Sequence, residues 1–173
     1  HGFRFTSITN PINAFFFKII EKILSFNTDI FITINNEDFN YARFNLFKKT
    51  KCYKINGVGL DLPKNYLKKR IGNKKRIKKI LVIAAYKKEK GYLELLKVAE
   101  KLKNKKIKIE CFGYGNKYKF NLIKIKKINN ISFKNFDTNL ESKIKEYDVL
   151  LHLSKREGLP VSVMQSLSEG LPI

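Results

Sequence analysis

Residues 80–112 read ILVIAAYKKEKGYLELLKVAEKLKNKKIKIECF. The first five residues form an apolar, β-branched run of the kind found in buried strands. A helix is predicted after them, because apolar residues recur there at three- and four-residue spacing. These residues are Tyr92, Leu95, Leu96, Ala99 and Leu102. A second apolar run ends at Phe112, so the stretch reads as strand, helix and strand, a unit whose two strands run parallel.

The same alternation continues to the last residue. The predicted strands are 80–84, 107–112, 131–133 and 149–153, and the predicted helices are 92–102, 117–128, 140–146 and 160–168. Strands that alternate with helices over short connections are typical of a parallel sheet in an α/β fold. Such a sheet binds ligands in the loops that follow the carboxyl ends of its strands. The loops that we expect to carry a site are 85–90, 113–116 and 154–159.

The first part of the chain predicts a second, smaller α/β unit. A helix is expected at 11–26, a strand at 29–35, a helix at 37–47 that Asn36 caps, and a strand at 51–56. A lysine-rich stretch then separates the two parts. The predicted division is a domain at 1–61, a basic linker at 62–79 and a larger domain at 80–173. A membrane-surface patch is the alternative interpretation of the linker.

The composition is strongly basic. The 173 residues carry a formal net charge of +21, which can indicate a nucleic acid or an anionic lipid surface as the partner. Arginine, which reads bases and phosphates with two hydrogen bonds, occurs only five times, and the excess charge is nearly all lysine. Abundant Lys, Asn, Ile and Phe are typical of an AT-rich coding sequence. We therefore expect no nucleic-acid partner.

Neither a metal site nor a membrane span is expected. Cys52 and Cys111 are far apart in apolar runs, show no zinc-ligand spacing, and are interpreted as buried, reduced thiols. Apolar runs stay short of the roughly 18 residues that a transmembrane helix requires.

Ser154–Gln165 carries the most informative pattern. It follows an apolar strand and opens a helix at Pro160, a residue favoured at the first helical position. The first turn of a helix offers free N–H groups to a phosphate, and Gly158 lets a ligand approach the backbone. Glu157 can accept hydrogen bonds from sugar hydroxyls. An ordinary strand–helix turn with a surface glutamate is the alternative.

This stretch resembles the signature of the retaining GT-B glycosyltransferases that build capsule, exopolysaccharide and lipopolysaccharide. Their pattern is two glutamates separated by seven residues, around Ser-x-x-Glu-Gly-x-Pro, and Ser154, Glu157, Gly158 and Pro160 match it. The resemblance implies that Glu157 lies near the donor sugar as a catalytic residue. At the position of the second glutamate, which holds the nucleotide ribose, stands Gln165. Its amide can bind a hydroxyl but carries no charge.

Two further loops resemble the same family. Lys90 before Gly91 matches a lysine that holds the donor phosphates, although Ala84 and Ala85 stand where the family has a glycine and its partner. A Gly-x-Gly turn begins at Gly113, and a tight turn without a ligand is its alternative role. The donor-binding residues that the resemblance implies are Lys90, Ser154, Gly158, Leu159, Gln165 and Gly113.

The beginning of the chain is similar to the family as well. His1-Gly2-Phe3 resembles a His-Gly-Phe segment whose histidine faces the cleft near the transferred sugar, which makes His1 the second catalytic candidate. Residues 29–38 and 56–61 resemble a strand followed by an acidic helix and the hinge between the domains. His152, near the end of a strand, is interpreted as structural.

The resemblance implies a GT-B type α/β fold, with part of an N-terminal Rossmann-like domain, most of a C-terminal Rossmann-like donor domain with a parallel sheet, and both ends incomplete. The implied enzyme moves a sugar from a nucleotide diphosphate sugar to a saccharide or lipid-linked acceptor, without metal or cofactor. It would work in the cytoplasm, with peripheral contact at the anionic inner face of the membrane. The alternatives are an inactive remnant, which Gln165 favours, and a basic module that binds nucleic acid or a membrane surface.

Overall fold

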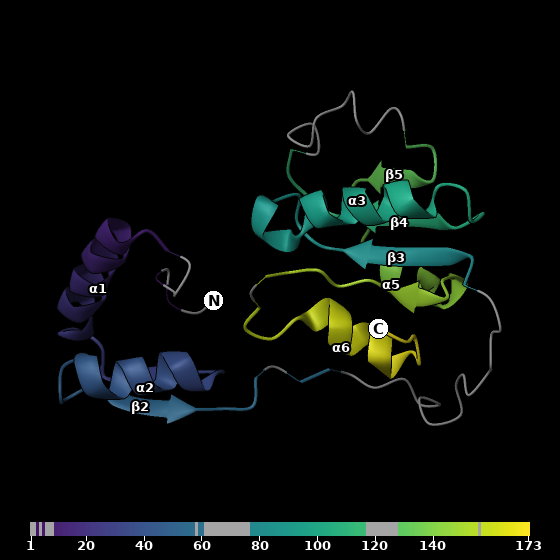
Figure 1. Ribbon diagram of the computed structural model, residues 1–173. Coiled ribbons are helices and arrows are strands. Elements are labelled where there is room, and N and C mark those ends of the chain that lie inside the picture. Colours follow the sequence, from purple (N-terminus) through teal and green to yellow (C-terminus); the bar gives the residue numbers. More distant parts are fainter. Residues whose placement is uncertain are drawn as a thin grey trace. The chain divides into compact units, whose positions relative to one another are not determined.

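The computed structural model describes residues 3, 5, 9–57, 59–60, 77–116, 128–155 and 157–173. The chain divides into two compact units, unit 1 at His1–Gly59 and unit 2 at Leu60–Ile173 (Figure 1). Most of the predicted linker and nearly all of the helix predicted at 117–128 lie outside the described residues. No helix among the described residues is long and apolar enough to cross a membrane.

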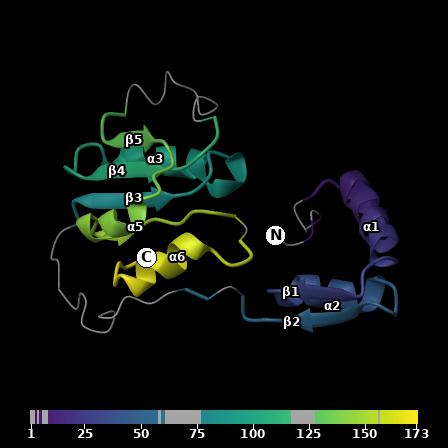
Figure 2. The same cartoon turned by 180° about the vertical axis from the view of Figure 1, so that it is seen from behind.

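Unit 1 is a small α/β unit. Its elements are α1 (Pro11–Ser25), β1 (Ile30–Thr33), α2 (Asn36–Asn45) and β2 (Lys51–Lys54). The two strands are parallel, with Ile30 opposite Lys51 and Thr33 opposite Lys54, and they lie side by side in Figure 2. A helix between two parallel strands is the connection that the sequence predicts. Its core gathers Phe3, Phe5 and Ala42, with partly buried apolar neighbours around them.

An asparagine side chain caps each of the two described helices of unit 1. The side-chain Oδ1 of Asn10 accepts a hydrogen bond from the Ile12 amide at 2.9 Å. Asn35, and not Asn36 as predicted, caps α2: its Oδ1 accepts from the Asp38 amide at 2.7 Å and its Nδ2 donates to the Asp38 carboxylate at 2.9 Å. The backbone of Asn35 is extended (φ −133°, ψ 161°), as a cap requires. Asn36 is already the first helical residue.

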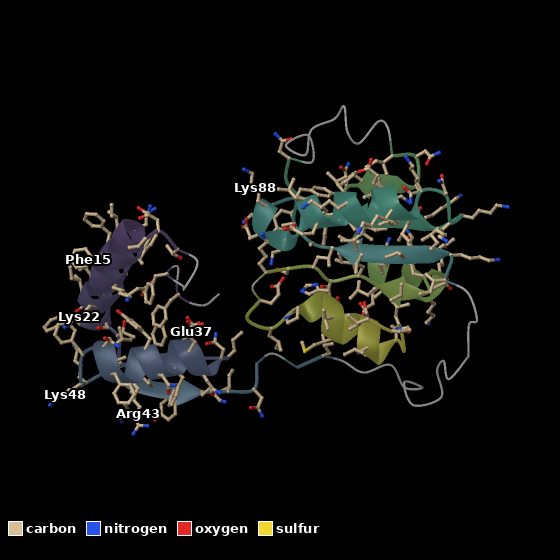
Figure 3. The ribbon with its side chains drawn as sticks, in the orientation of Figure 1. Phe15, Lys22, Glu37, Arg43, Lys48 and Lys88 are labelled. Carbon is tan, nitrogen blue, oxygen red and sulfur yellow. The ribbon has the colours of Figure 1, made fainter. Side chains whose placement is uncertain are left out.

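The outer face of α1 is a stripe of large apolar side chains at helical spacing. Exposed fractions along it reach 67% at Ile12, 62% at Phe15 and 64% at Ile23, and Phe15 and Lys22 project outward from the helix in Figure 3. The stripe consists of Ile12, Phe15, Phe16, Ile19, Ile20, Ile23 and Leu24. Only a narrow opposite face, with Ala14 and Phe17, packs on the unit's core.

Unit 2 is a four-stranded parallel sheet with helices on both faces. The strands are β3 (Lys79–Ile83), β4 (Lys108–Phe112), β5 (Ile131–Lys134) and β6 (Val149–Leu150), in the spatial order β5-β4-β3-β6. Its helical elements are η2 (Lys88–Lys90), α3 (Tyr92–Leu102), α5 (Leu140–Lys143), η4 (Ile144–Glu146) and α6 (Val161–Ser168). In both views, α3 and α6 lie on either side of β3 (Figures 1 and 2).

Most predicted elements differ in extent at one end or both, and three differences concern the region after β5. The strand predicted at 149–153 is observed only at Val149 and Leu150, because after the hydrogen bond from the Leu151 amide to the Leu81 carbonyl the chain leaves the sheet to form a loop. The helix predicted at 140–146 tightens after Lys143 into the 3₁₀ turn η4. Pro160 precedes α6 as its cap residue, with an extended ψ of 97°, and does not occupy the first helical position.

Residues of β3 alternate between two hydrophobic cores. Ile80 and Val82 face the core that contains Tyr92, Leu95 and Ala99 of α3. Leu81 faces the other core, which holds Leu140, Ile144, Tyr147, Leu150 and Leu171. Alternation with apolar residues on both sides is what a strand covered on both faces requires.

The two cysteines differ in burial. Cys111 is fully buried in the α3-side core, where burial raises the pKa of its thiol, so the thiol is inert. Cys52 is half-buried, and not buried as predicted, because it lies in the two-stranded sheet of unit 1.

Candidate functional site

Strand order places a topological switch point at the carboxyl ends of β3 and β6. The chain runs from β3 outward through β4 to β5, and then returns to place β6 on the opposite side of β3. The helices that follow β3 and β6 pack into different cores, on opposite faces of the sheet. In an open parallel sheet, ligands usually bind where strand order reverses in this way. The candidate site is therefore the switch point between β3 and β6.

The loop after β3 is held tightly against the loop after β6. Gly91 has a φ of +77°, and a Cβ atom at this position would lie 2.2 Å from the Leu153 carbonyl oxygen. The Lys155 amide also donates to the Glu89 carbonyl at 2.9 Å. Only glycine allows both this backbone conformation and this close approach. Lys90, next to Gly91, is thereby brought beside the segment that leads from β6 to α6.

Three side chains meet at this switch point and form the site cluster, defined as Lys90, His152 and Glu157. Lys90 Nζ donates to Glu157 Oε1 at 2.6 Å, and His152 Nε2 lies 3.5 Å from the same oxygen. Their exposed fractions are 22%, 17% and 25% respectively, so the cluster is only partly open to solvent. Lys90 and Glu157 are 67 positions apart in the sequence. The fold thus brings together two residues that the sequence predicts as donor ligands.

Glu157 is ionised at neutral pH. Burial by itself raises its pKa, but hydrogen bonds from Lys90 and Ser154, together with the positive charge of Lys90, outweigh burial and hold the pKa below its ordinary value. The Ser154 hydroxyl is therefore a further support of the Glu157 carboxylate. A carboxylate in this state accepts hydrogen bonds and donates none.

Gly113 lies at the end of β4 and keeps the neighbouring strand end close. A Cβ atom at Gly113 would lie 2.0 Å from the Ala84 carbonyl oxygen, so a side chain has no room there. The Ala84 carbonyl accepts a hydrogen bond from the Tyr92 hydroxyl at 2.7 Å. Gly113 therefore allows the ends of β3 and β4 to pack closely beside the switch point.

The other predicted site residues lie around the segment that enters α6. Gly158 and Leu159 form the turn between Glu157 and Pro160. Gln165 is a partly exposed residue on the second turn of α6, and its side chain makes no hydrogen bond with the described residues. His1 lies outside the described residues.

The first turn of α6 is a ready anion site. No side-chain hydrogen bond caps this helix. The Val163 amide already donates to the Pro160 carbonyl at 3.0 Å, so within the described residues the N–H groups of Val161 and Ser162 are left for a ligand. These groups and the positive end of the helix dipole favour a phosphate. His152 and Glu157 of the site cluster belong to the segment that leads from β6 to this helix end, so groups suited to hydroxyls and to phosphates lie on one segment of the chain.

His152 was missed as a member of the site. The sequence interpretation treats it as structural, because it lies near the end of a predicted strand. The available signal was its alternation with Ser154: side chains two positions apart in an extended segment share a side. No group of three His, Cys, Asp or Glu side chains that could hold a metal ion occurs in the described part of the chain.

Comparison with known proteins shows the following similarities. The family model described as glycosyl transferases group 1 matches residues 64–173. EpsD, a proposed glycosyltransferase of Bacillus subtilis (strain 168), is 26% identical over 186 residues, which cover 99% of this chain and 49% of EpsD. The chain therefore spans about half the length of this curated relative.

Solved structures agree in fold. A variant of TarM from S. aureus, in complex with fondaparinux, alpha-GlcNAc-glycerol and UDP, has a TM-score of 0.69 at 19% identity, over 99% of this chain and 34% of TarM. The pneumococcal O-GlcNAc transferase GtfA, in complex with UDP and GlcNAc, has a TM-score of 0.67 at 17% identity, over 90% of this chain and 31% of GtfA. The predicted α/β fold of GT-B type is thereby confirmed.

Proposed function

Because the chain belongs to the family of glycosyl transferases group 1, we propose that unit 2 binds a nucleotide diphosphate sugar and that the whole protein transfers this sugar to a saccharide or lipid-linked acceptor. The observation that carries the proposal is the contact of Lys90 with Glu157 at the β3–β6 switch point. One residue has the charge for a diphosphate and the other has the acceptor oxygens for a sugar. UDP is bound by two proteins of similar fold, TarM and GtfA.

The diphosphate is assigned to Lys90 and the N-terminus of α6. When the bond between sugar and phosphate breaks, negative charge grows on the leaving diphosphate. A fixed ammonium group and backbone N–H groups stabilise that charge without a metal ion. A free Lys90 ammonium is a prerequisite, so a donor must draw it away from Glu157.

The sugar is assigned to Glu157. Its ionised carboxylate can accept hydrogen bonds from hydroxyl groups, and the Ser154 hydroxyl donates one hydrogen bond to it. Gln165 is assigned to the ribose through its amide, Gly158 and Leu159 to the turn below the donor, and His1 to the cleft near the transferred sugar. Transfer with retention of the anomeric configuration is part of the proposal.

The proposals for the acceptor and for the location rest on the exposed surface of unit 1 and on the net charge of the chain. The exposed apolar stripe of α1, with Lys22 beside it, and the net charge of +21 favour peripheral contact with an anionic membrane. A cytoplasmic enzyme at the inner face of the membrane, acting in surface polysaccharide synthesis, fits such a contact. The second candidate is a catalytically inactive relative, which the uncharged Gln165 favours.

Calorimetric titration of the purified chain with UDP, GDP and their sugar conjugates tests the proposal. We expect saturable binding of one nucleotide, loss of that binding in Lys90→Ala, and loss of the added affinity for the sugar conjugate in Glu157→Ala. Lys88→Ala is the matched control, because Lys88 lies on the same 3₁₀ turn and is exposed (Figure 3). A folded chain that binds none of these ligands would be an inactive relative.

A further inference from the structure

His152 presents an unused hydrogen-bonding atom to the site cluster. Its Nε2 is buried and, with respect to the described residues, has no hydrogen-bond partner. The atom lies 3.5 Å from Glu157 Oε1, within reach of its charge but without hydrogen-bond geometry. That same oxygen accepts the hydrogen bond of Lys90 at 2.6 Å. Lys90 and His152 thus lie near the same carboxylate oxygen, and of these two residues Lys90 is the one that forms a hydrogen bond to it.

Donor binding removes the present partner of Glu157. If Lys90 turns to a phosphate group, the Ser154 hydroxyl is the one hydrogen-bond donor that the described residues leave to this carboxylate. The Glu157 side chain is 25% exposed, and a partly desolvated charge that loses a partner is costly. Lys155, another cation of this loop, is engaged with Glu94 at 3.2 Å. The buried Nε2 of His152 already lies 3.5 Å from the oxygen that Lys90 would vacate. A shift of well under about 1 Å would bring the two atoms to the ordinary length of a hydrogen bond.

We propose that His152 is a positioning residue that takes over the Glu157 carboxylate when Lys90 moves to a donor phosphate. The Nε2–H group then donates to Oε1 and holds the carboxylate in place for the sugar hydroxyls. The inference rests on the proposed function, because it assumes that a diphosphate binds Lys90. The backbone on both sides of His152 is fixed, since the Leu151 amide donates to the Leu81 carbonyl at 2.8 Å and Leu153 is in contact with Gly91.

A double-mutant cycle on nucleotide affinity tests the inference. The ligand is UDP or GDP, whichever the wild-type chain binds more tightly by calorimetry. His152→Leu removes the donor while keeping apolar bulk, and His152→Gln keeps an N–H group near the position of Nε2. Both variants are also made in the Glu157→Gln background, where no carboxylate charge has to be compensated. Circular dichroism and thermal unfolding confirm that each variant is folded.

We expect His152→Leu to weaken nucleotide binding about tenfold, as expected for a lost hydrogen bond to a charged group. His152→Gln should stay within about threefold of the wild type, and His152→Leu should have less than about a twofold effect in the Glu157→Gln background. Equal losses in both backgrounds would assign His152 a purely structural role, and an unchanged affinity in His152→Leu would equally overturn the inference. A wild-type chain that binds neither nucleotide would instead refute the proposed function, and the inference with it.

Discussion

Replacing Glu157 by glutamine should move the affinities for a nucleotide and for its sugar conjugate in opposite directions. The substitution keeps the size of the side chain and removes the charge that now holds Lys90 at 2.6 Å. Both partners are less than a third exposed, so the pair is worth more than an open surface ion pair, about 1 kcal/mol. Freed Lys90 can bind a phosphate without first breaking this contact. The affinity for UDP or GDP alone should therefore rise about fivefold.

The sugar conjugate should bind Glu157→Gln about twofold more weakly than it binds the wild type, because its loss at the sugar exceeds the gain at the phosphate. Hydrogen bonds from sugar hydroxyls to a carboxylate are stronger than those to a neutral amide, by about 1 to 1.5 kcal/mol for a pair of bonds. The advantage of the conjugate over the bare nucleotide should then fall about tenfold. Calorimetry with both ligands on the wild type, Glu157→Gln and the control Lys88→Ala gives the comparison. Weaker binding of both ligands by a similar factor would refute the assignment of Lys90 to phosphate and Glu157 to sugar.

Three further outcomes follow from the described contacts. Gly91→Ala should destabilise unit 2 by about 2 kcal/mol or more in urea unfolding, because the φ of Gly91 is +77° and Leu153 leaves no space for a Cβ atom. Gly59→Ala is the control and should be nearly neutral, because no atom lies within 4 Å of a Cβ at that position. The difference in the free energy of unfolding between the wild type and Glu157→Gln should have its full size above pH 4.5, the ordinary pKa of a glutamate. It should shrink as pH falls through the lowered pKa of Glu157 in the folded state. A difference that stays constant between about pH 7 and 3 would contradict the pairing with Lys90. Phe16→Ser with Ile20→Ser should weaken binding to anionic lipid vesicles in a sedimentation assay while changing stability by no more than about 0.5 kcal/mol, and Phe44→Ser, exposed on another helix, should weaken it less.

Local patterns predicted most of the elements. The apolar run before Ala84 and the face formed by Tyr92, Leu95 and Ala99 are periodic along the chain, and β3 and α3 occupy those segments. The errors lie at ends, where contacts decide: β6 ends at Leu150 because its continuation turns into the site loop, and Asn35 caps α2 because its backbone is extended.

Within the site, residue types were predictable and partners were not. Glu157 and Lys90 could be named as donor ligands from a family resemblance, but nothing local in the sequence states that they touch. In a chain with 36 lysines and arginines, each glutamate has many cations to choose from. The place of His152 near the end of a predicted strand favoured a structural interpretation, and only the tertiary structure shows its Nε2 at 3.5 Å from Glu157.

The sequence by itself determined the α/β class, the segments that form strands and helices, and the residue types available for a diphosphate and a sugar. Those properties depend on spacing along the chain, which the order of residues contains directly. Only the tertiary structure decided the strand order β5-β4-β3-β6 and hence the switch point between β3 and β6. It also decided the meeting of Lys90, His152 and Glu157 across 67 positions, because strand order and side-chain contacts are set by packing between segments far apart in the chain.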